Sequence, residues 1–453
     1  MYNFGKSVNR VVIPELSEMV VMQSVINAHE NYIDNEDTYV LESLDFYYNQ
    51  NLDTHLEQWF ASESLSQVPP YVTSCVPRFA RARMMLYKEP PKRFIGGERN
   101  EMYDDISFKL DSKTKEFAEL SWLLGHCWMK SKYNERKQRL EYEVLPMVQE
   151  YYHTSDSEPY GYSYEIESPD NHKRFVFWSE QRDGVDGMHF EFNQKGERIP
   201  ISEDMINPYK INPISRVEFS SSSYDVTRVS LHLAIAMTEV ALGIRSKLGQ
   251  PVFTGIDEGQ SRLKAGIDNA IIIPEGASFD YKSPSGSITE MIEGVKAMAN
   301  QVAENNQLRI RWGESGGNVP SGEALRIMEI ENLESRKSDE GVFREWEHSR
   351  YEIDRRILET HNVSNLSEDY AVDFGEVSFP MSPQEERNWL DWKIKNGIMT
   401  QKDLLLYFNS DMTDSELDEK LGEVREEQRA TVEATQPTQP TFEGLRKLGT
   451  INS

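Results

Sequence analysis

A long helical pattern constrains this chain more than any other feature. The residues from Ser321 to Asn362 are helix-compatible throughout, and a helix of about forty residues would be roughly 60 Å long at about 1.5 Å per residue. Helices in globular domains usually run about 8–20 residues. Phe343, Trp346, Ile353 and Ile357 are spaced to keep the far half of this helix attached to an apolar surface. The pattern therefore indicates an elongated or assembled object rather than a small enzyme.

A glycine-rich segment precedes this helix. Arg309–Pro320 reads RIRWGESGGNVP, with glycines at positions 313, 316 and 317. Glycine reaches backbone conformations that are closed to other residues. We therefore expect a mobile, backbone-exposing loop that leads directly into the long helix.

Length and composition indicate a folded, acidic protein. The 453 residues suffice for about two to four domains, and a hydrophobic fraction of 38% supports a real core. The formal charge is −27. This charge opposes non-specific wrapping of nucleic acid, because phosphate binding needs clustered lysine and arginine. It does not exclude a protein that lets DNA pass without gripping it.

Cysteine usage favours a reducing compartment. Cys75 and Cys127 are the two cysteines, and neither belongs to a CxxC pair, so we expect neither a disulfide framework nor a zinc site. The N-terminal residues MYNFGKSVNRVVIPELSEM lack an uninterrupted apolar h-region. No run approaches the roughly eighteen apolar residues of a spanning helix. We therefore expect no signal peptide and no membrane-spanning segment.

Residues 1–221 combine helices with an antiparallel meander. The first part of the pattern predicts helices with short strands between them, including one strongly apolar helix over Phe117–Lys130. Over Leu140–Ile201 apolar and polar residues alternate between Asp-Gly and Lys-Gly turns, which predicts antiparallel strands. Two Asn-Pro breaks in NPYKINPISRVEF, residues 207–219, close this part.

A helix with a clear start signal follows. Ser222 and Asp225 resemble a capping box, and Gly249 and Pro251 end the helix. The residues between, Val226–Leu248, are apolar on nearly every side through the middle. Such a helix is buried between neighbours rather than against one face. His232 within it is expected to be a satisfied core or interface histidine rather than a metal ligand.

A second helix over residues 287–308 begins at a full capping box of Ser287 and Glu290. One apolar stripe at helical spacing follows: Ile288, Met291, Ile292, Val295, Met298 and Val302. Between the two helices lies Gln250–Gly286, rich in glycine and proline, in which AIIIPEG, residues 270–276, is the clearest strand.

The C-terminal part consists of short predicted elements and is rich in charged residues. YAVDFGEVSFP, residues 370–380, predicts a strand pair or one bent strand. Residues 382–408 and 413–434 each predict an amphipathic helix, and 436–453 predict a flexible tail. The complete pattern predicts a mainly helical α+β fold.

The chain lacks the strong signatures of catalysis: it has no GxxxxGK[ST], GxGxxG, HExxH or GxSxG motif. The GESGG stretch, residues 313–317, lacks the lysine of a phosphate loop. NSDMTDSELDEK, residues 409–420, has Asp414 and Lys420 where a calcium loop needs Gly and Glu. We expect no catalysis, no cofactor and no metal, although a hydrolase with an unrecognised acidic site stays open.

The order of these elements resembles the portal protein, or head-to-tail connector, of tailed bacteriophages. Four short stretches match the manner of that family: FYYNQN after an N-terminal helix, RARMMLYKEPP as a wing helix, NPYKINPISRVEF before the stem, and SGEALRIMEIENLESRK at the start of the long wing helix. The ordered set covers about Leu41–Glu427, which is nearly the whole chain.

The resemblance implies a wing, a stem, a clip and a crown that assemble as a ring. The corresponding residues are 1–221 and 321–380 for the wing, 222–249 and 287–308 for the two stem helices, 250–286 for the clip, 309–320 for a tunnel loop, 381–435 for the crown helices and 436–453 for a tail.

The family architecture implies three groups of functional residues. Tunnel-loop residues would face a DNA channel: Arg309, Arg311, Trp312, Gly313, Gly316, Gly317 and Asn318. Stem residues would contact neighbouring subunits, because a ring places copies on both sides of an all-round apolar helix: Val229, Leu233, Ala236, Val240 and Ile244. Clip residues would dock partners: Phe253, Ile256, Ile272, Pro274, Phe279 and Tyr281.

The resemblance also implies a function, partners and a location. A ring of about twelve subunits would form the channel at one capsid vertex through which double-stranded DNA is packaged and ejected. The partners would be the terminase large subunit, head-tail adaptor proteins, and the major capsid or scaffolding protein. The protein would assemble in the host cytoplasm and reside in the virion, with no membrane partner. Besides the hydrolase, another minor head or tail virion protein is the alternative.

Overall fold

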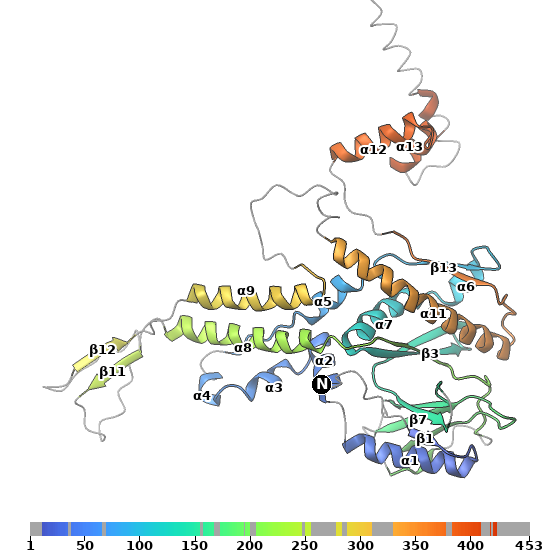
Figure 1. Cartoon of the computed structure of the whole chain (residues 1–453), viewed down its shortest axis with the longest axis horizontal. Coiled ribbons are helices and arrows are strands. Elements are labelled where there is room, and N and C mark those ends of the chain that lie inside the picture. The colour runs from blue at the N-terminus through green and yellow to red at the C-terminus, as the bar shows by residue number, and fades with distance from the viewer. Residues whose placement is uncertain are drawn as a thin grey trace, which may run out of the picture. The chain divides into compact units, whose positions relative to one another are not determined.

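A computed structural model describes residues 11–34, 38–65, 69–154, 157–166, 173–193, 195–199, 205–246, 250–254, 278–282, 288–309, 329–376, 383–408, 417 and 420–423. The chain divides into two units. The first comprises Met1–Gly317 and Met328–Val377, and the second comprises Asn318–Ile327 and Ser378–Ser453. The first unit contains both helices and sheets (Figure 1), which confirms the predicted α+β class.

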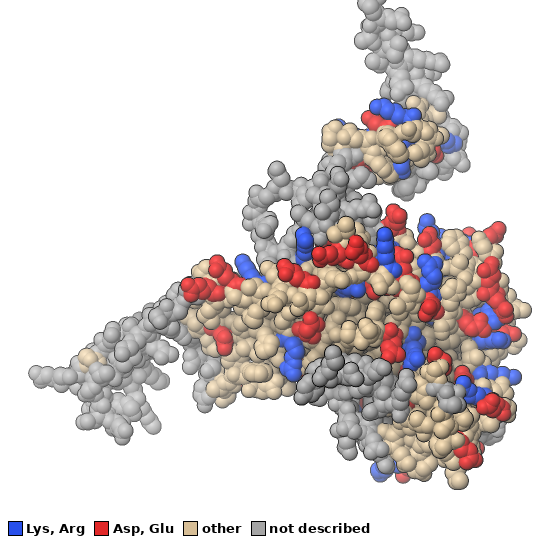
Figure 2. Space-filling model, viewed as in Figure 1, with Lys and Arg blue, Asp and Glu red and all other residues tan. Residues whose placement is uncertain are grey.

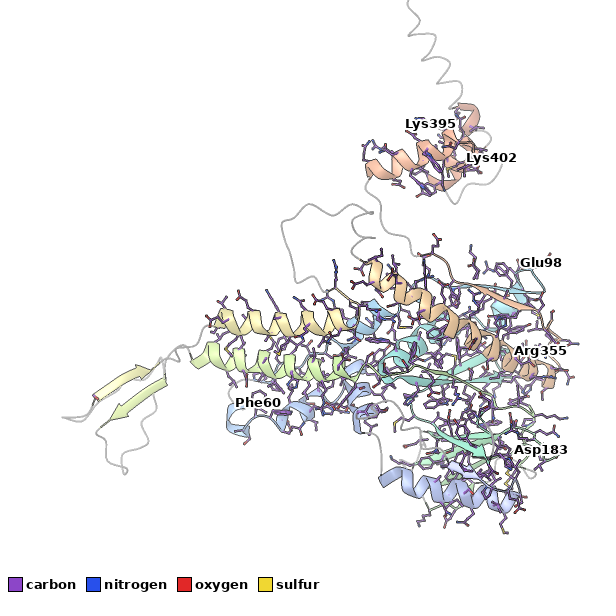
Figure 3. The ribbon with its side chains drawn as sticks, in the orientation of Figure 1. Phe60, Glu98, Asp183, Arg355, Lys395 and Lys402 are labelled. Atoms are coloured by element: carbon purple, nitrogen blue, oxygen red, sulfur yellow. The ribbon has the colours of Figure 1, made fainter. Side chains whose placement is uncertain are left out.

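The long helix α11 spans Ile330–Thr360, 31 residues, and runs through the core of the first unit. Phe343, Trp346, Ile353 and Ile357 are buried, as the apolar spacing predicted. Figure 3 shows side chains filling the space around this helix, with Arg355 labelled near its end. The predicted start at Ser321 lies outside the described residues.

A three-stranded antiparallel sheet packs against α11 and α7. Helix α7 spans Leu110–Leu124, and the strands are β3 (His126–Asn134), β4 (Arg139–Leu145) and β10 (Ile214–Glu218), in the order β10-β3-β4. The Asn-Pro segment thus contains a strand as well as the predicted breaks. This strand leads directly into the next helix.

The predicted helix over Phe117–Lys130 is wrong beyond Leu124. Gly125 ends α7 with a φ of 82°, a left-handed conformation that favours glycine. A Cβ at this position would lie 3.0 Å from the backbone nitrogen of Ser222. The following residues form a strand because β4 and β10 supply pairing partners on both edges of β3.

The predicted meander is confirmed in part: its first strand, β4, belongs to the three-stranded sheet, and the strands that follow it form part of a larger sheet. Six strands are ordered β1-β5-β6-β7-β8-β9: β1 (Val11–Ile13), β5 (Gln149–His153), β6 (Gly161–Ile166), β7 (Arg174–Ser179), β8 (His189–Asn193) and β9 (Arg198–Ile199). The β1–β5 pair is parallel and the others are antiparallel. Helix α1 (Glu18–Asp34) covers one face through Val21 and Val25.

Short helices and strands complete the first unit. They are α2 (Thr38–Tyr48), α3 (Leu52–Glu57), α4 (Ser62–Leu65), α5 (Val76–Arg83), η1 (Met85–Tyr87), β2 (Lys92–Ile95), α6 (Glu101–Ile106) and β13 (Tyr370–Asp373). Strand β13 pairs antiparallel with β2, which confirms the strand predicted at Tyr370.

Two antiparallel helices, α8 (Tyr224–Ser246) and α9 (Ile288–Asn305), form a hairpin in the first unit. Helix α8 begins after Ser223 rather than at the predicted cap, Ser222. The chain between the helices contains the antiparallel pair β11 (Gln250–Thr254) and β12 (Ser278–Lys282). The strand predicted at residues 270–276 lies outside the described part of the chain.

The described residues of the second unit form two helices, α12 (Pro383–Lys395) and α13 (Gln401–Phe408). The single helix predicted over 382–408 is therefore wrong: the chain turns at Gly397, which has a φ of 68°. Lys395 and Lys402, labelled in Figure 3, stand on either side of this turn. Most of the helix predicted over 413–434, and all of the tail, are outside the described residues.

Within the described part of the chain, one segment is long and apolar enough by composition to cross a bilayer. It is Tyr224–Ile244 of α8, 21 residues, where no such segment was expected. Core helices of soluble proteins meet the same criterion. Helix α8 packs against α9, α2, α3, α5 and α7 of the same chain.

Candidate assembly site

The helical hairpin is held together by a small apolar seam. Leu233 of α8 and Val295 and Ala299 of α9 are buried together, with Ala236 and Met237 packed against them. Alanine has no side chain beyond Cβ, so the two backbones approach closely along this line. A hydrogen bond from the Asn306 amide to the Asp225 carboxylate, 3.0 Å long, sets the register at one end.

An extended segment, Pro70–Cys75, runs along α8; we call it the strap. The backbone N–H of Tyr71 donates to the Thr238 hydroxyl at 2.9 Å, and the N–H of Cys75 donates to the Ser230 hydroxyl at 3.0 Å. Eight residues of helix and four residues of extended chain each span about 12–13 Å. The spacing of the two hydroxyls therefore matches the strap, and both hydroxyls are buried.

We predict that Thr238→Val weakens the strap. The substitution keeps the side-chain volume but leaves the Tyr71 N–H without its acceptor, which should lower the free energy of unfolding by about 1–3 kcal/mol in urea titration. Thr360→Val is the matched control, because the Thr360 hydroxyl also donates to the carbonyl four residues earlier but is exposed. Equal effects of the two substitutions would contradict a specific role for Thr238.

The surface of α8 corrects one sequence interpretation. Asp225, Arg228, His232 and Glu239 are exposed and recur at helical spacing, so they form a polar stripe along the helix. The helix is therefore not apolar on every side, and His232 is a surface residue rather than a core histidine. Its remaining sides are covered by other elements of the same chain.

The five predicted stem contacts have different environments. Leu233 and Val240 are buried within the single chain, so their burial needs no neighbouring copy. Val229 and Ala236 are half-buried at the α8–α9 seam, and Ile244 is 56% exposed. Of these residues, Ile244 offers the largest free surface.

Helix α9 presents two different surfaces. Val295, Ala299 and Ala303 face the protein and are buried. Met291 and Met298, which were predicted to share a stripe with Val295, are instead 39% and 42% exposed. Glu290, Glu293 and Glu304 are exposed, and Figure 2 shows acidic side chains along this helix.

The predicted clip and tunnel-loop residues are only partly within the described chain. Phe253 and Phe279 are directly opposite each other in the β11–β12 pair, and Tyr281 is opposite Pro251. Arg309 follows α9 and is exposed. The others are outside the described residues: Ile256, Ile272, Pro274, Arg311, Trp312, Gly313, Gly316, Gly317 and Asn318.

A buried network of charged side chains holds α11 in the core, and the sequence pattern did not predict this network. Glu347 is fully buried and accepts hydrogen bonds from Arg93 of β2, Arg350 and Tyr370 of β13 at 2.8–3.1 Å. Burial alone would raise the pKa of Glu347, but the guanidinium groups of Arg93 and Arg350 lower it well below its ordinary value. The carboxylate is therefore ionised inside the core.

The same network continues one turn along α11. Arg350 pairs with Asp354, which also accepts hydrogen bonds from the hydroxyls of Tyr103 (α6) at 2.7 Å and Tyr142 (β4) at 2.9 Å. Arg93 also pairs with Asp111 at 2.6 Å, so the two arginines of the network are paired with three carboxylates. The spacing of Glu347, Arg350 and Asp354 was visible in the sequence, but such spacing also occurs on solvated helices.

Within the described residues there is no group of three or more His, Cys, Asp or Glu side chains placed to hold a metal ion. The buried Ser230 hydroxyl is used by the strap, and the buried carboxylates Glu347 and Asp354 are paired with arginine. These two carboxylates therefore help to hold α11 in the core.

No model of a known protein family matches this chain, and no curated protein sequence matches it. Among solved structures it is similar to a chain of the neck of a native GTA particle computed with C12 symmetry, at 13% identity. The match covers 78% of this chain and 97% of that chain, with a TM-score of 0.35. At this level the likeness carries no argument about function.

Proposed function

We propose that the protein is a subunit of a ring-shaped portal, the channel at one capsid vertex through which double-stranded DNA is packaged and ejected. One observation carries the proposal. Two antiparallel helices enclose an inserted strand pair in the sequence, and a helix of 31 residues anchored in a mixed core follows. This order is the order of stem, clip, stem and wing in the portal family.

In this proposal each part has a mechanical role. Helices α8 and α9 form the stem, and residues 250–286 form the clip that docks the terminase large subunit and later the head-tail adaptor proteins. Residues 309–320 form the tunnel loop, anchored by the buried network of α11. Residues 381–435 form the crown, and the wing meets the major capsid or scaffolding protein. Assembly takes place in the host cytoplasm and the ring stays in the virion.

The negative charge of the chain supports a channel through which DNA passes, rather than a surface that binds DNA tightly. Each copy adds a formal charge of −27, and the exposed glutamates of α9 are part of it. Repulsion between carboxylates and phosphates prevents tight binding, because tight binding needs clustered lysine and arginine. The protein itself performs no catalysis in this proposal, and a separate ATPase supplies the work.

Electron microscopy of the purified full-length chain tests the proposal. We expect rings of about twelve copies with a central hole, and native mass spectrometry should give the corresponding mass. A chain that stays a compact monomer at micromolar concentration would overturn the proposal and favour the alternative of an acidic hydrolase.

A further inference from the structure

Two exposed apolar surfaces lie on the hairpin. The first, the strap surface, consists of Tyr71 (46% exposed) and Val72 (49% exposed). The second, the methionine surface, consists of Met291 and Met298 of α9. Neither pair is needed for the α8–α9 seam, which Leu233, Val295 and Ala299 form.

The two surfaces lie on opposite sides of the hairpin. Successive residues of an α-helix turn by about 100°, so Met291 and Met298 fall roughly 60–80° from the line on which Val295 and Ala299 meet α8. Because both helices are right-handed and they run antiparallel, Met291 and Met298 of α9 lie on the same side of the hairpin as Arg228, His232 and Glu239 of α8. The strap is held by Ser230 and Thr238, on the other side of α8.

Both surfaces also lie at the same height along the hairpin. The Asn306–Asp225 hydrogen bond joins the two antiparallel helices at one end and fixes a common height there. Counted from this bond by equal numbers of residues, backwards along α9 and forwards along α8, Met298 lies level with Leu233 and Met291 lies level with Val240. Thr238, which holds Tyr71, lies between these levels. Rotation about a ring axis parallel to the hairpin moves a residue to the next subunit without changing its height.

One pair of charges near the two surfaces is complementary. Glu239 is exposed on the methionine side, and Lys296 of α9 is exposed on the strap side at a similar height. An aromatic ring opposite methionine sulfur is a favourable contact. Tyrosine and methionine are also enriched at the centres of protein interfaces.

We propose that the strap surface of one copy packs against the methionine surface of the next copy, so that these residues form the stem contact of the ring. The inference rests on the proposed portal function and assigns the contact to residues other than those expected from the sequence. Two different patches on opposite sides make a heterologous contact, which generates a closed ring when the rotation closes.

Mixing two single variants tests this contact. Met298→Glu spoils one surface and Tyr71→Glu the other, so each variant alone should lose the rings that the wild type forms and sediment as a monomer. A mixture of the two restores one intact contact, between the strap surface of Met298→Glu and the methionine surface of Tyr71→Glu. We expect dimers and no larger species by analytical ultracentrifugation.

Met19→Glu is the matched control, because Met19 on α1 is 79% exposed and lies outside the hairpin. It should form rings like the wild type, and circular dichroism should show that all three variants are folded. Rings from either single variant, or a mixture without dimers, would overturn this contact and leave the portal function standing. A monomeric wild type would overturn the portal function itself.

Discussion

Glu347→Ala is expected to lower the free energy of unfolding by about 3–5 kcal/mol, the usual effect of breaking a buried ion pair from one side. The substitution leaves the guanidinium groups of Arg93 and Arg350 in the core, where their side chains are 8% and 0% exposed. It also removes the acceptor of the Tyr370 hydroxyl. Urea titration followed by circular dichroism measures the loss.

Glu345→Ala is the control on the same helix, because Glu345 is exposed and should change stability by no more than about 0.5 kcal/mol. A loss below about 1 kcal/mol for Glu347→Ala would show that the network does not hold α11.

Acid titration gives an independent check on the same residue. The pKa of Glu347 is lowered in the folded protein, so its contribution is complete above the pKa of an unfolded glutamate, about 4.3, and is lost as the pH falls below that value. The difference in stability between wild type and Glu347→Gln should therefore shrink below about pH 4. A difference that stays constant down to pH 3 would contradict an ionised Glu347.

Trp346→Ala is expected to lower the free energy of unfolding by about 3–5 kcal/mol through loss of packing and the cavity left behind. The Trp346 ring stacks on Phe117 of α7 with centroids 4.5 Å apart, and its indole N–H donates to the Ser215 hydroxyl of β10 at 3.0 Å. One side chain thus joins α11, α7 and the strand that leads into α8. Hydrogen exchange should show lower protection in β10.

Trp392→Ala is the matched control, because Trp392 on α12 is 55% exposed. Its substitution should leave the unfolding of the first unit unchanged. Similar losses for the two tryptophans would mean that burial in the α7–α11 core is not what stabilises the protein.

Local patterns predicted elements whose signals are contained in a few residues. The period of two over Leu140–Ile201 correctly indicated strands, and the spacing of Phe343, Trp346, Ile353 and Ile357 correctly indicated an attached long helix. The prediction over Phe117–Lys130 failed because apolar residues suit a buried helix and a buried strand equally. Gly125 was the available signal for the boundary between them.

Part of the candidate site was visible in the same way. The two helices of the hairpin were predicted within a few residues of their ends, because their start and stop signals are local. Which side of each helix is covered was not predictable, since that depends on distant parts of the chain. Met291 and Met298 share helical spacing with Val295, yet only Val295 meets α8.

By itself, then, the sequence determined the acidic charge, the order of helices and strands, and the periodicity that places apolar residues on shared faces. These depend on composition and on neighbours a few residues apart. Only the tertiary structure decided that β10 pairs with β3, that the strap lies on Thr238 and Ser230, and that Glu347 is buried between Arg93 and Arg350. These contacts join residues separated by up to about 250 positions, and no local pattern selects one distant partner among many of the same chemistry.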